Sequence, residues 1–409
     1  MEDWLRSAAR ERPDHPAVIA GGRAVSYAEL DESTARVARR LAAAGVRVSD
    51  RVRVTHPPGI AFAGLLHAVP RLGAVFEPHP PTDPPEPSLD GGEADVALRQ
   101  VDPGAVHTVI HTSGTTGAPK AVELTFANHA ASAAASADAL GTEPGDRWLC
   151  PLPLHHVGGL AVLIRCAIAR TTAVLHERFE VERVKAAFEA GEVTLASLVP
   201  TMLVRLRDAG LREAPGLRAI ALGGGPIPAG LLDWAADTGI PVVPVYGMTE
   251  TSSQVVAGSP GRPLRGVELR IGADGEILVR GPMVAAGSLA ADGWLHTGDQ
   301  GRLDDEGRLH VEGRVKDLIV TGGENVAPLE VEQVLLAHPA VADAGVTGRP
   351  DEEWGEAITA FVVLRAPADG EALRAWCRQR LAPHKVPKAV EIVDVLPRNP
   401  AGKLERGRL

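Results

Sequence analysis

The sequence predicts an α/β fold: a large N-terminal domain of mostly parallel sheets with helices plus a β-rich subdomain, and a small α+β C-terminal domain. The chain has 409 residues, which is more than one hydrophobic core usually supports. Apolar runs that end in Gly or Pro turns alternate with helical patterns, and this alternation favours a parallel sheet. From Ile271 onward, short polar strands with Gly turns replace that pattern, and a new helix-and-strand pattern follows.

The N-terminal elements follow from hydrophobic spacing. Residues 27–41 (YAELDESTARVARRL) place apolar side chains at helical intervals and predict an amphipathic helix. RVRVTHP near residue 51 predicts a short strand. Residues 77–93 (EPHPPTDPPEPSLDGGE) are rich in Pro, which fits neither a sheet nor a helix, so we expect a surface loop. VHTVIHT (106–112) predicts a strand, and the Ala-rich residues 128–140 predict a helix.

Three more strands are expected in the middle of the chain, at residues 194–200, 217–225 and 240–247. Helical patterns separate them, which favours a parallel sheet. Ligands of such sheets gather where the carboxyl ends of the strands meet loops.

The residue pattern changes again at GRVKD (313–317). Beyond it, LIVTGG and ITAFVVL predict strands and PLEVEQVLL predicts a helix. We therefore predict an N-terminal domain of residues 1–313, a connecting segment of residues 314–317 and a C-terminal domain of residues 318–409.

The composition predicts a cytoplasmic protein. A net charge of −10 argues against a nucleic-acid partner, which needs a basic face. Three widely spaced cysteines, Cys150, Cys166 and Cys377, suit a reducing compartment. The N-terminus has no apolar signal segment, and no apolar stretch reaches the roughly 20 residues of a membrane span. The composition leaves open whether the chain forms a homo-oligomer.

The segment HTSGTTGAPK, from His111 to Lys120, has the residue types of a phosphate-binding loop. Small residues after a strand let backbone N–H groups converge on an anion, and the glycines allow close approach. Lys120 adds a mobile positive charge. The spacing of its glycines and lysine is not GxxxxGK[ST], so the segment is not the P-loop of the nucleoside triphosphatases. Taken alone, the segment favours phosphate binding only modestly over the alternative, a surface turn with a solvated lysine.

Four more segments follow in a fixed order. They are YGMTE (246–250), WLHTGD (294–299), GRVKD (313–317) and PRNPAGK (397–403). Each alone could be a turn, but the whole series in this order is not expected by chance.

Together these segments resemble the motifs of the adenylate-forming enzymes, the superfamily of acyl-CoA synthetases, peptide-synthetase adenylation domains and luciferases. The resemblance runs from about Tyr27 to Lys403. It implies that a carboxylate attacks ATP to give an acyl-adenylate and pyrophosphate, and that a thiol then displaces AMP. ATP, Mg²⁺ and coenzyme A are the implied cofactors. The chain departs from the family at Ala121, where many members have Gly, and in its shorter length, with the Pro-rich stretch near residue 80 marking lost material.

The resemblance assigns the phosphate and metal contacts. Residues that would wrap the β- and γ-phosphates are Thr112, Ser113, Gly114, Thr115, Thr116, Gly117 and Lys120. Thr249 would contact the α-phosphate. Glu250, together with Thr116, would hold Mg²⁺, a hard cation that prefers oxygen ligands.

The resemblance also assigns the nucleoside contacts. Asp299 would accept hydrogen bonds from both ribose hydroxyls, with Arg314 assisting. Tyr246 would stack on adenine, which would lie against the backbone of Gly223, Gly224 and Gly225.

Residues beyond 313 would serve both half-reactions. Lys403 would bridge the acyl carboxylate and the α-phosphate during adenylation, unless it is an ordinary solvated lysine. Lys316 lies where the family has a hinge, so the small domain would be mobile. Rotation about it would bring Gly322 and Gly323 to the site, where they would let the pantetheine arm pass.

Three further C-terminal residues are candidates for CoA contacts. Trp354 would pack on the CoA adenine or, equally, form part of a core. Lys385 and Lys388 would meet CoA phosphates, or they belong to a solvated basic loop.

The segment PLPLHHVGG (151–159) resembles the family segment that lines the acyl pocket. His156 lies at the motif histidine, and a packed pair with His155 is the alternative. A zinc site at Cys150, His155 and His156 is not expected, because no second Cys/His pair follows at ligand spacing. His107 and His111, on an apolar strand, are expected in the core or at its rim.

The acid is suggested by TETSSQ (249–254) and SLVPTML (197–203), which resemble the o-succinylbenzoate-CoA ligases of menaquinone biosynthesis. PLPLHHVGG lacks the aspartate with which peptide synthetases pair a substrate amine, so an amino acid is not expected. Candidate partners for the carboxylate that is not activated are Thr201, Ser253, Gln254 and His129, each of which could instead be structural. A CoA ligase for another aryl or acyl acid, a luciferase-like oxidase, and a nucleotide-binding protein without catalysis are the alternatives.

Overall fold

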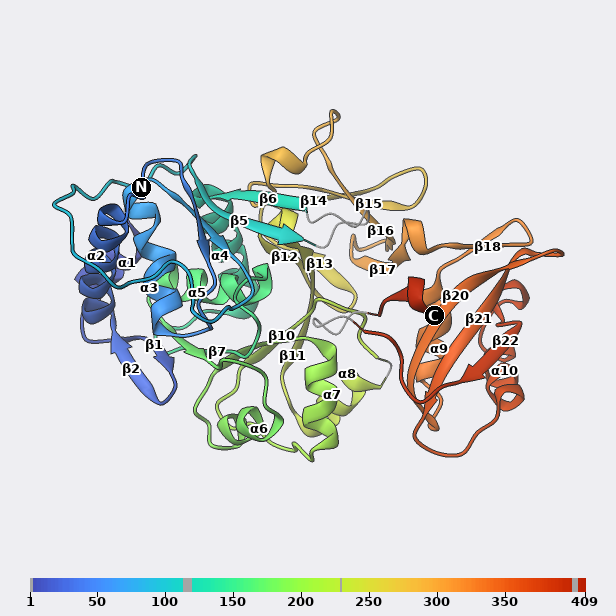
Figure 1. The fold of residues 1–409 in the computed structure, drawn as a ribbon. Helices are drawn as coiled ribbons and strands as arrows, with labels where there is room; N and C mark the ends of the chain where they lie inside the picture. The colour runs from blue at the N-terminus through green and yellow to red at the C-terminus, as the bar shows by residue number, and fades with distance from the viewer. Residues whose placement is uncertain (1–2, 113–119, 229, 399–403) are drawn as a thin grey trace.

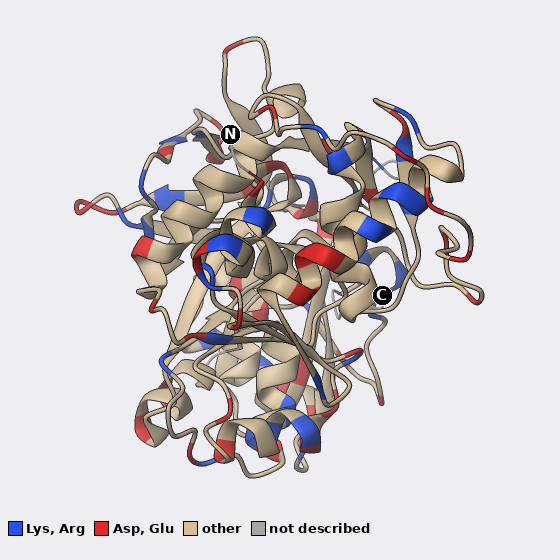
Figure 2. Ribbon diagram, turned by 90° about the vertical axis from the view of Figure 1, so that its left-hand side faces the viewer, with Lys and Arg blue, Asp and Glu red and all other residues tan. Residues whose placement is uncertain are grey.

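The computed structural model describes residues 3–112, 120–228, 230–398 and 404–409. Figure 1 shows a large N-terminal part, coloured blue to yellow, and a smaller C-terminal part, coloured orange to red. Figure 2 shows Lys and Arg interspersed with Asp and Glu over the helices and loops. None of the helices in the described residues combines the length and apolarity that a membrane span requires.

The largest sheet within the described residues has 13 strands, in the order β14-β15-β16-β17-β13-β12-β11-β10-β9-β7-β8-β1-β2. Its parallel strands are β1 (Pro16–Ala20), β8 (Thr172–Leu175), β7 (Arg147–Cys150), β9 (Leu195–Leu198), β10 (Ala219–Leu222) and β11 (Val242–Met248). β2 (Arg23–Ser26) pairs antiparallel with β1 at one edge. The predicted parallel sheet in the middle of the chain is therefore confirmed.

The β-rich part extends this sheet because β11 pairs antiparallel with β12 (Ser253–Gly258). The strands that continue from there are β13 (Gly261–Pro263), β17 (Leu309–Arg314), β16 (Leu295–Leu303), β15 (Glu276–Arg280) and β14 (Glu268–Ile271). The polar strands expected from Ile271 onward are thus present, and they share one hydrogen-bonded sheet with the apolar parallel strands.

A second sheet of the N-terminal part has four strands, β3 (Arg51–Val54), β4 (Val75–Pro78), β5 (Val106–Thr112) and β6 (Lys120–Thr125). The first three are parallel, and β6 is antiparallel to β5. The predicted strand at residues 106–112 coincides with β5. Residues 79–105, between β4 and β5, form no helix or strand. The loop predicted at residues 77–93 is therefore present from His79 onward, but the prediction is wrong for Glu77 and Pro78, which pair with β3 as the end of β4.

Helices cover both sheets. They are α1 (Trp4–Glu11), α2 (Tyr27–Ala43), α3 (Ile60–Ala68), α4 (Phe126–Leu140), α5 (Val157–Ala169), α6 (Val181–Glu189), α7 (Pro200–Asp208) and α8 (Leu231–Thr238). Helix α2 begins with a capping box, in which the Ser26 hydroxyl accepts from the Glu29 N–H and the Glu29 carboxylate accepts from the Ser26 N–H. Short 3-10 turns are η1 (Pro70–Leu72), η2 (Thr249–Thr251) and η3 (Ala286–Ser288).

The C-terminal part has its own sheet and core. Its strands are β18 (Ile319–Thr321), β19 (Glu324–Val326), β20 (Val341–Asp351), β21 (Gly355–Leu364) and β22 (Ala389–Ile392). Its helical elements are η4 (Val315–Asp317), α9 (Pro328–Leu336), α10 (Gly370–Arg378), η5 (Pro383–Lys385) and η6 (Arg406–Arg408). β17 ends at Arg314 in the large sheet and β18 begins at Ile319 in the small one. The predicted connecting segment therefore lies between two separate sheets.

Candidate active site

Two of the predicted nucleoside-binding residues, Tyr246 and Arg314, converge on the carboxylate of a third, Asp299. Tyr246, on β11, donates its hydroxyl to Asp299 Oδ2 at 2.9 Å. Arg314 Nε lies 3.1 Å from Asp299 Oδ1, and the two residues face each other in the register of β16 and β17. Asp299 is 7% exposed, and burial together with this negative charge raises the pKa of Tyr246 well above its usual value. The carboxylate is held rigidly as a hydrogen-bond acceptor.

The glycine run after β10 lies against the strand that carries Tyr246. A Cβ at Gly223 would be 2.7 Å from the carbonyl oxygen of Val245, so only glycine fits there. Gly224 has a φ of +82°, in the left-handed region that favours glycine. Gly223, Gly224 and Gly225 thus form a backbone surface beside Tyr246, as a flat ring lying on them would require.

The segment after β11 is a tight turn. A Cβ at Gly247 would lie 2.0 Å from the carbonyl oxygen of Ser253, so the chain folds back without space for a side chain. The Thr251 hydroxyl accepts from the Met248 N–H at 3.0 Å and donates to the Ser253 carbonyl at 2.7 Å. Ser252 and Ser253 have φ values of +52° and +96°. These hydrogen bonds and φ values together define the shape of the TETSSQ turn.

Thr249 and Glu250 lie at the start of the turn, half-buried at the carboxyl end of β11. The Glu250 backbone carbonyl accepts from the Ala285 N–H at 2.8 Å, which fixes its position. Within the described residues, the Glu250 carboxylate makes no hydrogen bond or ion pair. A half-buried carboxylate without a protein partner suits an Mg²⁺ ion, because this cation prefers oxygen ligands.

The ends of the predicted phosphate loop are held together. Thr112, at the end of β5, and Lys120, at the start of β6, are paired in register, and the Thr112 hydroxyl donates to the Lys120 carbonyl at 3.3 Å. The other predicted loop residues, Ser113, Gly114, Thr115, Thr116 and Gly117, lie outside the residues that the structure describes.

The two predicted acyl-pocket histidines are neighbours at the start of α5. The rings of His155 and His156 lie 4.3 Å apart, with His155 half-buried and His156 exposed. Burial, helped by the charges of His156 and His79, lowers the pKa of His155 to about 4, so this ring is neutral at pH 7. A Cβ at Gly159 would be 2.5 Å from the Pro153 carbonyl oxygen, so the turn PLPLHHVGG needs this glycine.

The predicted acid-binding residues come from three elements, α4, α7 and β12. Thr201 lies in the first turn of α7, and Ser253 begins β12. Gln254 is buried and donates to the Ser136 hydroxyl at 3.1 Å. His129 is buried on α4, 2.9 Å from the Thr108 hydroxyl, and burial with the nearby charge of Arg165 lowers its pKa to about 3. Gln254 and His129 thus have partners within the protein.

Sequence reasoning missed Arg165, which is the one charged residue of α5 and is 5% exposed. Its Nη2 lies 3.5 Å from the Ser132 hydroxyl, which in turn donates to the Ser252 carbonyl at 2.7 Å. Its Nε has no hydrogen-bond partner, and no carboxylate of the described residues forms an ion pair with it. Burial lowers its pKa to about 10, so it is charged at pH 7. A cation within the apolar run GLAVLIRCAIA was the signal that could have found it.

In the C-terminal part, three predicted CoA-binding features meet. Gly322 and Gly323 form the exposed turn between β18 and β19, with φ values of +60° and +83°. The Gly322 N–H donates to the Trp354 carbonyl at 2.8 Å, and a Cβ at Gly322 would lie 3.0 Å from the Trp354 ring. Lys388 Nζ lies 3.7 Å from the centroid of that ring, a cation–π contact.

The other C-terminal candidates lie apart from this cluster or beyond the described residues. Lys385 is paired with the Glu330 carboxylate at 2.7 Å. Lys316 is exposed within η4, between the two sheets. Lys403 lies outside the described residues, whereas Arg398 and Leu404, on either side of that gap, form an antiparallel bridge.

Two family models match the chain. The model for AMP-binding enzymes matches residues 5–88 and 79–289, and the model for the C-terminal domain of AMP-binding enzymes matches residues 330–403. The first match is divided into two pieces within the segment that begins at His79, where the Pro-rich loop starts.

Full-length relatives are also found. The chain is 39% identical to a 2-succinylbenzoate–CoA ligase from Bacillus licheniformis, in an alignment that covers 100% of this chain and 99% of that protein. That alignment is 473 positions long and therefore exceeds the 409 residues of this chain, so it contains gaps in this chain.

Solved structures of o-succinylbenzoate CoA synthetase from Bacillus subtilis are similar at 36% identity. The complex with the acyl-adenylate intermediate has a TM-score of 0.92, covering 100% of this chain and 98% of that one. The complex with ATP and a magnesium ion has a TM-score of 0.91, covering 100% and 99%. A double mutant with a product analogue, OSB-NCoA, has a TM-score of 0.73 at the same identity, covering 100% and 98%.

Proposed function

Because this chain belongs to the AMP-binding enzyme family, we propose that it is an ATP-dependent 2-succinylbenzoate–CoA ligase of menaquinone biosynthesis. The observation that carries this proposal is the similarity to 2-succinylbenzoate–CoA ligases, which covers both chains almost from end to end. The two sequence resemblances, to adenylate-forming enzymes and to this group of ligases, are confirmed by the same comparisons.

In the first half-reaction, a substrate carboxylate oxygen attacks the α-phosphorus of ATP, and the bond to pyrophosphate breaks. Asp299, positioned by Tyr246 and Arg314, binds the ribose hydroxyls and so fixes the α-phosphate relative to the acid. A magnesium ion held by Glu250 would offset phosphate charge, which otherwise repels the attacking anion. Lys403 is proposed to bridge the carboxylate and the α-phosphate.

In the second half-reaction, the sulfur of CoA attacks the acyl carbon and AMP leaves. Gly322 and Gly323 are proposed to let the pantetheine arm pass, with Trp354 against the CoA adenine. Lys388, over the Trp354 ring, would have to leave that face or share it with the adenine. Lys385 is a weaker candidate because Glu330 already neutralises it.

The two half-reactions are proposed to use different domain orientations, with Lys316 as the hinge. Supporting this, the TM-score is 0.92 to the adenylate complex of the B. subtilis enzyme and 0.73 to its product-analogue complex. Identity and coverage are the same in both comparisons, so the present structure is more similar in shape to the adenylate complex than to the product-analogue complex. Two domain orientations would produce such a difference.

Arg165 is proposed to recognise the second carboxylate of the acid. 2-Succinylbenzoate bears two carboxylates, of which one is activated, and burying the other one unpaired would cost several kcal/mol. Arg165 is a buried guanidinium that lacks a carboxylate partner among the described residues and reaches the TETSSQ turn through Ser132. The two unpaired charges would neutralise each other in the complex.

We also propose the cytoplasm as the location. The three cysteines, Cys150, Cys166 and Cys377, are all buried and free, as a reducing compartment allows.

The proposed function is tested by CoA-dependent AMP release over a panel of acids: 2-succinylbenzoate, benzoates, cinnamates, medium-chain fatty acids and amino acids. We expect 2-succinylbenzoate to give the highest kcat/KM. A higher kcat/KM for another acid would assign that acid as the substrate, and the proposed reaction type would be unchanged. If no acid releases AMP, the chain only binds nucleotides.

Replacing Asp299 by Asn is expected to raise the KM for ATP about tenfold to hundredfold, because a hydrogen bond to a charged group contributes about 1.5–3 kcal/mol. The readout is discrimination between ATP and its 2′,3′-dideoxy analogue, which should shrink in the variant. Asp292→Asn, which changes an exposed carboxylate in the turn before β16, is the control. Unchanged discrimination would show that Asp299 only supports the local structure.

A further inference from the structure

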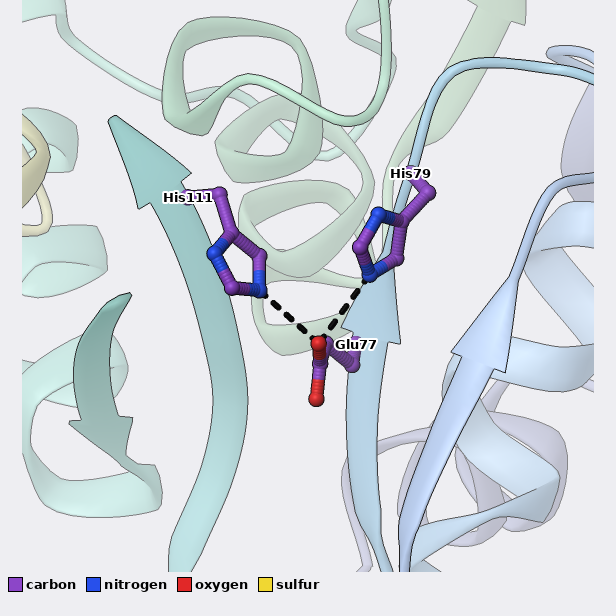
Figure 3. Close-up of side chains that lie close together, drawn as sticks. All are labelled: Glu77, His79 and His111. Atoms are coloured by element: carbon purple, nitrogen blue, oxygen red, sulfur yellow. Dashed lines mark hydrogen bonds and ion pairs between the residues drawn. The ribbon is translucent and has the colours of Figure 1, made fainter. Parts of the chain in front are cut away.

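Glu77, His79 and His111 bring three metal-binding side chains together at one end of the four-stranded sheet. His79 Nε2 lies 3.0 Å and His111 Nε2 lies 2.8 Å from the same oxygen, Glu77 Oε1. Figure 3 shows the two imidazole rings pointing toward this carboxylate from either side. Their three ligand atoms lie within 4.8 Å of one another. None of these residues has a role in the proposed ligase reaction.

Backbone pairing fixes the three side chains in place. Glu77 lies on β4, in register with Arg53 of β3, and His79 follows the end of β4. The His79 N–H donates to the Val54 carbonyl at 2.8 Å. His111 lies on β5, which runs parallel to β4. Because the strands hold all three residues, little conformational entropy would be lost when an ion binds.

Two of the three ligand–ligand distances are close to those of a zinc site. Zinc binds imidazole nitrogens and carboxylate oxygens at roughly 2.0–2.2 Å, so tetrahedral ligands lie roughly 3.3 Å apart. The two N···O distances, 2.8 and 3.0 Å, need to lengthen by only a few tenths of an ångström to admit an ion. The ring hydrogens would then be on Nδ1, leaving Nε2 to bind the metal.

We propose that Glu77, His79 and His111 bind one divalent transition-metal ion of the zinc type. Two imidazoles and one carboxylate favour Zn²⁺, Co²⁺ or Ni²⁺ over Mg²⁺, which prefers an all-oxygen shell. The side chains are 15%, 22% and 32% exposed for Glu77, His79 and His111, so an ion can enter from solvent. Three protein ligands leave a fourth position for water.

The ion would join the carboxyl ends of β4 and β5 next to the predicted phosphate loop. His111 lies one residue before Thr112, from which that loop departs. His79 begins the Pro-rich segment, at which the match to the AMP-binding family model divides. One side of the site therefore borders the segment at which the family match divides, and a bound ion would stabilise the sheet at that place.

The test is metal binding by the untagged, chelator-treated full chain. We expect Co²⁺ to give a saturable visible absorption band at one equivalent per chain, and Zn²⁺ to displace it. His79→Ala and Glu77→Gln should each weaken Zn²⁺ binding by more than about 100-fold. Loss of a residue that only supports a metal ligand weakens affinity by about 10–100-fold. Zn²⁺ should also raise the melting temperature of the wild-type chain and not that of these variants.

The matched control is His296→Ala. His296 also contacts two carboxylates, Glu276 at 2.7 Å and Asp292 at 3.4 Å. It does so through different ring nitrogens, so its replacement should leave metal binding at Glu77, His79 and His111 unchanged. Circular dichroism without metal shows whether each variant is folded. Absence of saturable Co²⁺ binding, equal binding by His79→Ala, or displacement by millimolar Mg²⁺ would each overturn the proposal.

Discussion

Replacing Lys403 by Ala is expected to lower the rate of acyl-adenylate formation by roughly two to three orders of magnitude, the effect of losing one donor that acts on the transition state. Charge builds on the phosphate oxygens as the carboxylate attacks, and a lysine that bridges both groups stabilises that charge. Thioester formation from supplied acyl-adenylate should stay largely intact, because the lysine would be withdrawn in the second domain orientation.

The measurement separates the two half-reactions. Pyrophosphate release with ATP and acid reports adenylation, and thioester formation from synthetic acyl-adenylate and CoA reports the second step. Lys185→Ala, which removes a lysine paired with Glu189 on α6, should leave both rates unchanged. Equal losses in both half-reactions would contradict the proposed domain rotation, and an unchanged adenylation rate would remove Lys403 from catalysis.

Elements with strong local signals could be predicted from the sequence. The strand β5 and the helix α9 coincide with the runs VHTVIHT and PLEVEQVLL, because β-branched residues in one and a Pro at the first helical position in the other specify the backbone locally. The helix expected at residues 27–41 ends two residues later, at Ala43. Such ends depend on capping contacts, which hydrophobic spacing does not determine.

Long-range pairing could not be predicted in the same way. The β-rich strands continue the large sheet because the turn after β11 returns the chain as β12, and this depends on positive φ at two serines. Serine rarely adopts that conformation, so nothing in local propensity indicates it. The motif TETSSQ indicates a resemblance to a group of ligases, whereas the geometry of its turn depends on strand pairing that only the fold shows.

Side-chain partners were the least predictable part of the site. His107 is buried as expected, and His111, expected at the core or its rim, is half-buried but shares the Glu77 carboxylate with His79. Glu77 and His111 are 34 positions apart, so their meeting follows from the parallel pairing of β4 and β5. Arg165 lies in an apolar run of the sequence. Only the fold shows that it is buried and lacks an acidic partner among the described residues.

Replacing Arg165 by Met is expected to raise the KM for 2-succinylbenzoate by about tenfold to hundredfold, since hydrogen bonds to a charged group contribute about 1.5–3 kcal/mol. Met is close to Arg in length and is apolar, and replacing a buried charge by an apolar side chain is often neutral or stabilising. The melting temperature should therefore be unchanged or higher, which separates a loss of binding from a loss of folding. The KM for ATP should not change.

The decisive comparison uses a mono-acid analogue that lacks the carboxylate that is not activated. The wild-type chain should prefer the di-acid. In the complex with the mono-acid analogue, the Arg165 guanidinium would stay buried without a carboxylate partner. In Arg165→Met that preference should disappear, because the second carboxylate would then be buried against an apolar side chain. Arg170→Met, just beyond the end of α5 and paired with Glu11, should keep the wild-type preference. An undiminished preference for the di-acid in a folded Arg165→Met variant would show that another residue recognises the second carboxylate.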